Sequence, residues 1–143
     1  MRHQKSQHGF TLIEVMVVIA IIGGILALVA TNIVGSADDA RVKTTQSQIK
    51  IIEGALDMYR LHNYRYPTTE QGLEALAQKP TSSPEPKNYQ SGGYLKGGKV
   101  PRDAWDNEFL YFENKGQVEI LSLGSDGQEG GEGDAADISN QAL

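Results

Sequence analysis

The stretch MRHQKSQHGFTLIEVMVVIAIIGGILALVA (residues 1–30) decides how the rest of the chain is organised. A basic leader ends at Gly9, and the apolar run behind it contains one charged residue, Glu14. No residue from Val15 to Ala37 is charged. Because a helix rises about 1.5 Å per residue, this segment is long enough to cross the roughly 30 Å hydrocarbon core of a bilayer. We therefore predict a membrane-spanning helix with one acidic side chain at its edge.

The composition indicates one small domain in addition to this anchor, because 143 residues are too few for two independent cores. The formal net charge is −5, and loss of residues 1–9 would leave 11 basic and 18 acidic residues, a net charge of −7. We therefore expect no nucleic-acid partner. Cysteine is absent, which excludes disulfides. Stability outside the cytoplasm must then come from packing, a bound metal or assembly.

Residues 1–8 are polar and basic, as at the start of a targeting segment, and positive charge before a membrane span keeps that end in the cytoplasm. An ordinary secretory signal is cleaved at small residues that follow its apolar region. Small residues occur inside the apolar run here, but no polar segment typical of such a cleavage site follows them closely. The alternative cut lies between Gly9 and Phe10. It would leave the apolar helix on the mature protein, with a free amine on Phe10.

The stretch GFTLIEVMVVIAIIGGILA (residues 9–27) resembles the class III signal of type IV pilins and type II secretion pseudopilins. The resemblance implies that a membrane-embedded prepilin peptidase cuts after Gly9 and methylates the new amine of Phe10. A carboxylate in hydrocarbon costs a few kcal/mol or more unless it is paired, so the N-terminal amine of a neighbouring subunit is a suitable partner for Glu14. The alternative is an interfacial Glu14 that reaches the lipid headgroups.

The apolar run also contains adjacent glycines, Gly23 and Gly24. Each costs a helix about 1 kcal/mol relative to alanine in water. The helix either loosens there or uses the glycines for close packing against another helix. Filaments of the resembled class are pictured with a loosened helix in this region, often beside a Pro-Asn pair, and here Thr31 stands in place of that proline.

We predict that one continuous helix extends from about Thr11 to Leu61. In its second half, apolar residues recur at spacings of seven and form one stripe that packs on the domain; a short free coiled coil is the alternative. Pro67 must follow the end of the helix, because proline disfavours helical geometry in the residue before it. The apolar stripe consists of Val42, Ile49, Ile52, Leu56 and Tyr59, and the residues expected to cover the helix end are Tyr59, Tyr64 and Tyr66.

The remaining chain predicts a small antiparallel sheet, so the fold class is α+β. Residues 68–80 are expected to form a short helix, with Thr68 and Gln71 at capping-box spacing. Residues 108–112 and 117–123 are β-prone runs joined by a hairpin turn at residues 113–116. Two strands alone would be marginal, and a third is expected either near Val100 or at residues 137–139. The irregular loop 81–99 would be held by Tyr89, Tyr94 and Leu95.

Two further stretches narrow the resemblance. The residues YRLHNYRYPTTEQGLEAL (59–76) resemble the major pseudopilin of type II secretion systems, the G-type subunit. The residues VPRDAWDNEFLYF (100–112) resemble that family's Pro-x-Asp-Pro-Trp-Gly segment, with Ala104 in place of proline and Asp106 in place of glycine. Trp105 is expected to be a core residue.

The segment SLGSDGQEGGEGDAAD (residues 122–137) crowds acidic side chains among glycines. Mutual repulsion could leave this loop disordered unless a cation neutralises it. Hard oxygen ligands suit Ca²⁺, whereas zinc would favour His or Cys. From the residues alone, a calcium site and a solvated acidic loop stay equally open. The acids are Asp126, Glu129, Glu132, Asp134 and Asp137.

The resemblance favours calcium, because it implies a site in this loop made of aspartates and backbone carbonyls. Asp126 matches the aspartate of the family's Leu-Gly-x-Asp-Gly motif, and Asp137 matches the Asp-Ile that closes the site. Asp134 is expected to be the middle ligand. Leu123 and Gln128 would contribute backbone carbonyls, whereas Glu129 and Glu132 are expected to be solvated.

We find no constellation for catalysis, since His62 is the only histidine beyond the leader and no cysteine nucleophile exists. Together with the resemblance, this predicts a structural subunit, not an enzyme. The resemblance implies a leader (1–9), an assembly helix (10–35) and a periplasmic domain (36–143) with a calcium loop (123–138).

The resemblance implies a homopolymeric pseudopilus that grows from the inner membrane into the periplasm and helps to push folded proteins through an outer-membrane channel. It also implies, as partners, minor pseudopilins, prepilin peptidase and an inner-membrane assembly platform with its ATPase. A major type IV pilin is one alternative, although such pilins commonly close their C-terminal region with a disulfide. A membrane-tethered, calcium-dependent protein of the cell envelope is the other.

Overall fold

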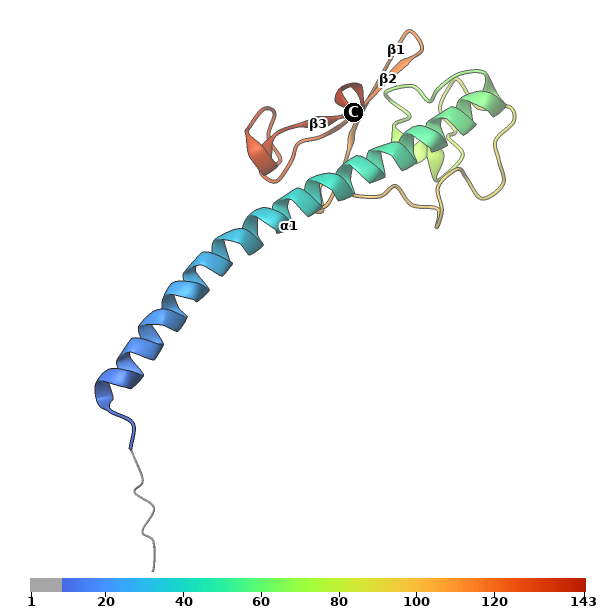
Figure 1. Ribbon diagram of the computed structural model, residues 1–143. Coiled ribbons are helices and arrows are strands. Elements are labelled where there is room, and N and C mark those ends of the chain that lie inside the picture. The colour runs from blue at the N-terminus through green and yellow to red at the C-terminus, as the bar shows by residue number, and fades with distance from the viewer. Residues whose placement is uncertain (1–8) are drawn as a thin grey trace, which may run out of the picture. The chain divides into compact units, whose positions relative to one another are not determined.

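The computed structural model describes residues 9–143, with the side chains of residues 30–34 and 36 left aside (Figure 1). The predicted leader therefore lies outside the described residues, except for Gly9. The chain divides after Ala37 into an N-terminal unit and a second compact unit, Asp38–Leu143. The fold is α+β, as predicted: a long helix α1, three strands and three short 3₁₀ helices. Their bounds are α1 Leu12–Asn63, η1 Leu73–Leu76, β1 Leu110–Asn114, β2 Gln117–Ser122, η2 Gly133–Ala135, β3 Ile138–Ser139 and η3 Asn140–Ala142.

The N-terminal unit consists of the first part of α1. Its segment Leu12–Val29 has a mean hydropathy of 2.9 and is long and apolar enough to cross a membrane, and none of it is buried within the chain. The helix continues through Gly23 and Gly24 without a break. A Cβ added at either glycine would meet nothing within 4 Å. The single chain therefore does not itself require glycine at these positions.

In the second unit, α1 buries one stripe of apolar side chains, which confirms the predicted amphipathic half. Ile49, Ile52 and Leu56 are fully buried. They share a core with Phe109 and residues of the sheet, and the strands lie along one side of this part of α1 (Figure 1). The sheet contributes Tyr111, Ile120 and Ile138 to this core.

The sheet is antiparallel with the order β1-β2-β3, and Leu121 of β2 pairs with both Leu110 and Ser139. The hairpin turn is the predicted one: Lys115 (φ 51°) and Gly116 (φ 85°) both have positive φ, as in the type I′ turns that suit the twist of a hairpin. The third strand comes from the C-terminal alternative, β3, and residues around Val100 form no strand.

The end of α1 only partly follows prediction. Tyr59 is 1% exposed and Tyr66 packs against the core, as expected, but Tyr64 is 88% exposed. The expectation that Tyr64 covers the helix end is wrong, because it adopts a left-handed conformation (φ 63°) that terminates the helix. The side chain of Asn63 caps this end by donating to the Tyr59 carbonyl at 3.0 Å.

The tyrosines hold the loop 81–99 against the helix end. The ring of Tyr94 lies 5.3 Å from that of Tyr59 and 5.2 Å from that of Tyr89. Leu95 is buried, so all three residues expected to hold the loop do contact the core. Tyr111 donates its hydroxyl to the Pro67 carbonyl at 2.8 Å, and burial raises the pKa of this hydroxyl well above its ordinary value.

The helix predicted at residues 68–80 is reduced to the four-residue 3₁₀ helix η1, which corrects that prediction. Its capping box does form: the Thr68 hydroxyl accepts from the Gln71 amide, and the Gln71 side chain accepts from the Thr68 amide, both at 3.2 Å. Gly72 has a φ of 61° and a ψ of −169° and so interrupts regular helix directly after the box.

The turn at residues 103–107 is organised by Asp103, which is 5% exposed. One carboxylate oxygen accepts from the amides of Trp105 (3.0 Å) and Asn107 (2.8 Å), and the other accepts from the Ser122 hydroxyl at 2.7 Å. Trp105 packs against the core, as predicted. Asp106 has a φ of 68°, which explains why glycine suits this position of the resembled motif.

We predict that Asp106→Val lowers the free energy of unfolding by about 1–2 kcal/mol, because a β-branched residue is strained at positive φ. Asp106→Gly should stay within about 1 kcal/mol of wild type, since relief of strain is offset by the greater freedom of glycine in the unfolded chain. The Asp106 side chain is 89% exposed, so the two variants differ mainly in backbone conformation. Urea unfolding of the unit Asp38–Leu143 measures both, and equal stabilities would contradict the explanation.

Candidate functional site

The first candidate site is the start of α1, where Thr11 and Glu14 form a reciprocal capping box. The Glu14 amide donates to the Thr11 hydroxyl at 3.3 Å, and the Thr11 amide donates to Glu14 Oε2 at 3.4 Å. An anionic side chain is favourable at this end of a helix. The carboxylate that marks the apolar run therefore has a local structural role in the single chain. The Thr-x-x-Glu spacing carries this signal in the sequence, whereas our prediction for Glu14 is an assembly contact or an interfacial charge and does not include its role in the helix cap.

The residues before the helix are accessible. Gly9 and Phe10 are exposed, Phe10 by 84%, so the peptide bond between them lies outside the folded part of the chain. Phe10 and Glu14 line a shallow apolar depression of about 270 Å³ together with side chains from the first turns of α1. The other lining residues are Val15, Val18 and Ile19. Phe10, at the predicted cleavage site, and Glu14, the predicted assembly acid, thus lie on one exposed surface.

The second candidate site is the acidic loop after β2, whose two ends are held together by backbone contacts. The Ser125 amide donates to the Asp134 carbonyl at 2.9 Å. Gly124 lies so close to residues 134–135 that an added Cβ would sit 2.8 Å from the Ala135 oxygen. The Asn107 side chain donates to the Gly124 carbonyl at 3.0 Å and ties the loop to the Asp103 turn. These contacts bring the two ends of the loop together.

The predicted calcium ligands are only partly brought together. Asp126 and Asp137 are exposed; one oxygen of Asp126 accepts from the Gln128 amide at 3.0 Å, and one oxygen of Asp137 accepts from the Gly130 amide at 2.9 Å. Asp134 lies half-buried in η2, and Leu123 directly follows β2. Within residues 9–143, no three His, Cys, Asp or Glu side chains converge as a ligand set.

The loop nevertheless has suitable donor chemistry for a hard cation. Over the described part of the chain, the second carboxylate oxygen of Asp126 and that of Asp137 have no hydrogen-bond partner, so each remains available as a ligand. Closure of the loop places the backbone near Asp126 beside the backbone near Asp134. Glu129 and Glu132 are exposed, in line with the expectation that they are solvated.

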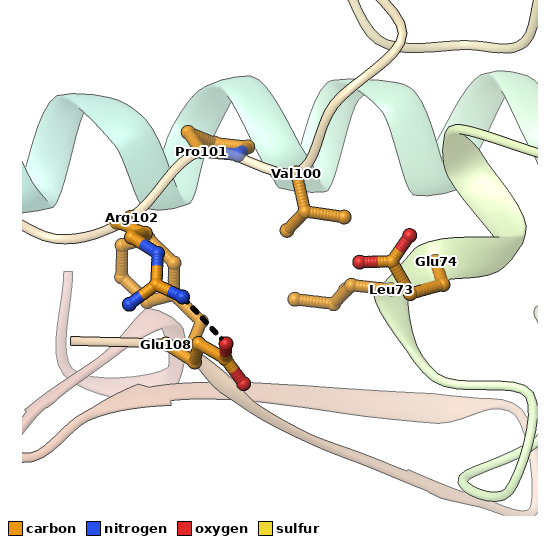
Figure 2. Close-up of a pocket in the computed structure, with 7 residues that line it drawn as sticks. Leu73, Glu74, Val100, Pro101, Arg102 and Glu108 are labelled. Atoms are coloured by element: carbon orange, nitrogen blue, oxygen red, sulfur yellow. Dashed lines mark hydrogen bonds and ion pairs between the residues drawn. The ribbon is translucent and has the colours of Figure 1, made fainter. Parts of the chain in front are cut away.

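Figure 2 shows a pocket of about 240 Å³ elsewhere on the second unit, with Leu73 and Val100 pointing into it. Arg102 pairs with Glu108 at 2.7 Å on one side and donates to the Asp106 carbonyl at 2.7 Å. The Arg102–Glu108 ion pair is exposed, and the contact of Arg102 with the Asp106 carbonyl holds the turn at residues 103–107. The pocket contains no nucleophile with an adjacent base, so we assign it no chemistry. The remaining lining residues are Glu74, Pro101 and Phe109.

A capped, exposed, apolar helix joined to a small α+β unit defines the class of pilin-like subunits, which are anchored through an N-terminal helix. Two family models match this chain: "Type II secretion system (T2SS), protein G" over residues 32–141, and "Prokaryotic N-terminal methylation motif" over residues 4–31.

Similar proteins agree with these matches. The chain is 49% identical to the type II secretion system core protein G of Vibrio cholerae over 142 residues, which cover 98% of this chain and 95% of that protein. It is also 49% identical to the protein of the same description from Pseudomonas aeruginosa, over 96% of each chain.

Among solved structures, the major pseudopilin from the type 2 secretion system of enterohaemorrhagic Escherichia coli matches with a TM-score of 0.66 and 41% identity, over 78% of this chain and 96% of that one. The chain belongs to the type II secretion system protein G family, the major pseudopilins. This confirms the resemblance seen at residues 59–76 and 100–112 and favours a pseudopilin over a type IV pilin.

The contact between Gly124 and residues 134–135 can be tested with a matched pair of glycines. Gly124 and Gly127 have nearly the same φ, 64° and 65°, but a Cβ at Gly127 would meet only an Asn107 side-chain oxygen at 3.9 Å. Both alanine variants should be strained. Gly124→Ala should cost about 1–3 kcal/mol more than Gly127→Ala in unfolding experiments, because it also overpacks backbone atoms. An equal cost would show that the loop is not closed in this way.

Proposed function

We propose that this chain is made as a membrane-inserted precursor, cut between Gly9 and Phe10 by prepilin peptidase and methylated on the Phe10 amine. The mature chain then polymerises through α1 into a periplasmic pseudopilus. The observation that carries the proposal is the segment Leu12–Val29, an apolar helix of which no part is buried within its own chain. The Glu14 carboxylate caps the start of this helix. The methylation motif at residues 4–31 and the exposure of Gly9 and Phe10 support the processing step.

Glu14 has the geometry for an assembly contact. Its Oε2 accepts from the Thr11 amide, while Oε1 has no hydrogen-bond partner within the part of the chain that the structure describes. A carboxylate accepts several hydrogen bonds, so one oxygen can cap the helix while the other accepts from the Phe10 amine of a neighbouring subunit. Cleavage after Gly9 creates that amine. In a low-dielectric surrounding, the pair would neutralise a charge that is otherwise costly, and so fix the axial step between subunits.

The remaining parts of the proposal rest on the family. The subunit would cross the inner membrane once, with the unit Asp38–Leu143 in the periplasm. It would work with minor pseudopilins and with an inner-membrane platform and its ATPase to move folded proteins across the outer membrane. Assembly, not catalytic turnover, is then the function. The side chain of His62 contacts the Tyr94 hydroxyl at 3.3 Å, so we assign it to packing at the end of α1.

A test of the charge pair should spare the helix cap. Glu14→Gln can still form a capping box but carries no charge, so it should lower filament yield at least about tenfold if a charge-assisted contact is lost. Thr11→Ala removes one half of the cap and keeps the charge, and should have the smaller effect. Yields are measured by electron microscopy of a reconstituted assembly system. Wild-type yield with Glu14→Gln would contradict the pairing.

We further propose that the loop 123–138 binds Ca²⁺. Asp126, Asp134 and Asp137 would hold the ion together with the backbone carbonyls of Leu123 and Gln128. When bound, the ion would supply positive charge that offsets the repulsion among these acids. The closed loop backbone and the unpaired oxygens of Asp126 and Asp137 support this assignment.

Calcium that binds only the folded state must raise its stability, by about 2.7 kcal/mol at a free concentration of 100 times the dissociation constant. The thermal midpoint of the unit Asp38–Leu143 should therefore be higher with Ca²⁺ than with chelator. Asp137→Ala should abolish the difference, whereas Glu129→Ala, at an exposed acid that we do not assign as a ligand, should retain it. Equal midpoints for the wild-type unit would remove calcium from the function.

A further inference from the structure

The hydroxyl of Ser122 joins a buried carboxylate to the start of the acidic loop. Ser122 is the last residue of β2 and is fully buried. Its hydroxyl donates to Asp103 Oδ2 at 2.7 Å and accepts from the Gly124 amide at 3.3 Å. One side chain thus connects the turn at residues 103–107 to the first peptide unit of the loop.

This connection fixes the direction of the Leu123 carbonyl, which we assign as a backbone ligand. The Leu123 carbonyl and the Gly124 N–H belong to the same peptide unit. Such a unit is planar, and in the trans form its C=O and N–H groups point in opposite directions. Because the N–H is directed at the Ser122 hydroxyl, the carbonyl points away from that hydroxyl. The direction of a proposed ligand therefore depends on side chains that precede the loop.

The next peptide unit is held from the same turn. The Gly124 carbonyl accepts from Asn107 Nδ2 at 3.0 Å. The Ser125 N–H, at the other end of this unit, donates to the Asp134 carbonyl at 2.9 Å. Asn107 is itself fixed, because its backbone amide donates to Asp103 Oδ1 at 2.8 Å. Two consecutive peptide units at the start of the loop are thus held by one turn.

Asp103 is not available as a ligand of the loop. Its side chain is buried, one of its oxygens accepts from two amides of its own turn, and the other accepts from the Ser122 hydroxyl. The turn is also anchored on α1, where the fully buried Thr45 accepts from the Ala104 amide at 3.1 Å. Asp103 therefore acts on the loop through Ser122 and Asn107.

We infer that Asp103 and Asn107 are positioning residues for the Ca²⁺ site proposed in the loop 123–138. Asp103 holds the direction of the Leu123 carbonyl through Ser122, and Asn107 holds the peptide unit that follows. Neither residue contacts the ion. The inference rests on the proposed calcium binding and extends it to residues outside the loop. Substitution of groups that orient metal ligands typically lowers metal affinity by about 10–100-fold.

The test is calorimetric titration of CaCl₂ into the full-length subunit in detergent. Asp103→Asn keeps the size of the side chain but has one acceptor oxygen in place of two, so it loses part of the network. Ser122→Ala removes the connecting hydroxyl and changes no charge. Each should lower the Ca²⁺ affinity about tenfold or more. The double variant should bind no more weakly than the weaker single variant, because both changes break the same connection.

Two control variants separate positioning from stability and from charge. Ile49→Val removes a methyl group from the core and should lower the thermal midpoint without changing the Ca²⁺ affinity. Glu129→Gln removes an exposed charge from the loop and should change the affinity by no more than about threefold, because exposed charges are screened. All titrations are made at a temperature at which the circular dichroism of each variant shows it to be folded.

The outcomes distinguish the inference from the function on which it rests. If the wild-type subunit binds no Ca²⁺, the proposed calcium site fails, and the inference fails with it. If the wild type binds, wild-type affinity in folded Asp103→Asn or Ser122→Ala overturns the inference alone, and so does an Ile49→Val variant that loses affinity to the same extent. If neither of the first two variants folds, Asn107→Ala decides: a loss of about tenfold or more supports the inference, and wild-type affinity overturns it.

Discussion

Burial of one face of α1 is the interaction on which the second unit depends. Ile49, Ile52 and Leu56 contribute fully buried side chains from the helix, and Tyr111 and Ile120 meet them from the sheet. Burial of apolar surface of this kind is the main favourable term in folding. A hairpin with a two-residue third strand would be marginal alone. The helix therefore acts as the scaffold of the unit, and the loops are held by the side chains that they pack against the core.

This arrangement gives the two halves of α1 opposite relations to their own chain. Between residues 38 and 63, one face of the helix is satisfied by intramolecular packing. None of the segment Leu12–Val29 is buried within the chain, and Glu14 is its one charged residue. A lipid bilayer and a bundle of like helices can each surround the apolar side chains of this segment. The same segment thus suits both the membrane-inserted subunit and the proposed filament. Under the proposed pairing with the Phe10 amine of a neighbour, Glu14 would favour the filament.

The sequence predicted those features that follow from periodicity and local turn chemistry. The seven-residue spacing from Ile49 to Leu56 predicted the helix and its buried face, and Lys115-Gly116 predicted the hairpin.

The length of the short helix predicted at residues 68–80 was overestimated, since apolar spacing does not reveal the extended ψ of Gly72. Tyr64 was misplaced because aromatic residues near a helix end are usually buried, whereas here the backbone conformation decides. The contact of Asp103 with Ser122 could not be predicted from spacing, because the two residues are 19 positions apart in the chain. Whether Asp126, Asp134 and Asp137 meet around one ion depends on loop conformation, which spacing alone does not determine.

The left-handed turn at Asp106 also has an evolutionary consequence. This position and Ala104 are the two at which the chain departs from the Pro-x-Asp-Pro-Trp-Gly motif that residues 101–106 resemble. Codons for aspartate and glycine differ by a single nucleotide, and so do those for alanine and proline. Each residue is therefore one point mutation away from the residue of the resembled motif. The Asp103 carboxylate holds the turn through the backbone amides of Trp105 and Asn107, so these hydrogen bonds use neither side chain at the two departing positions.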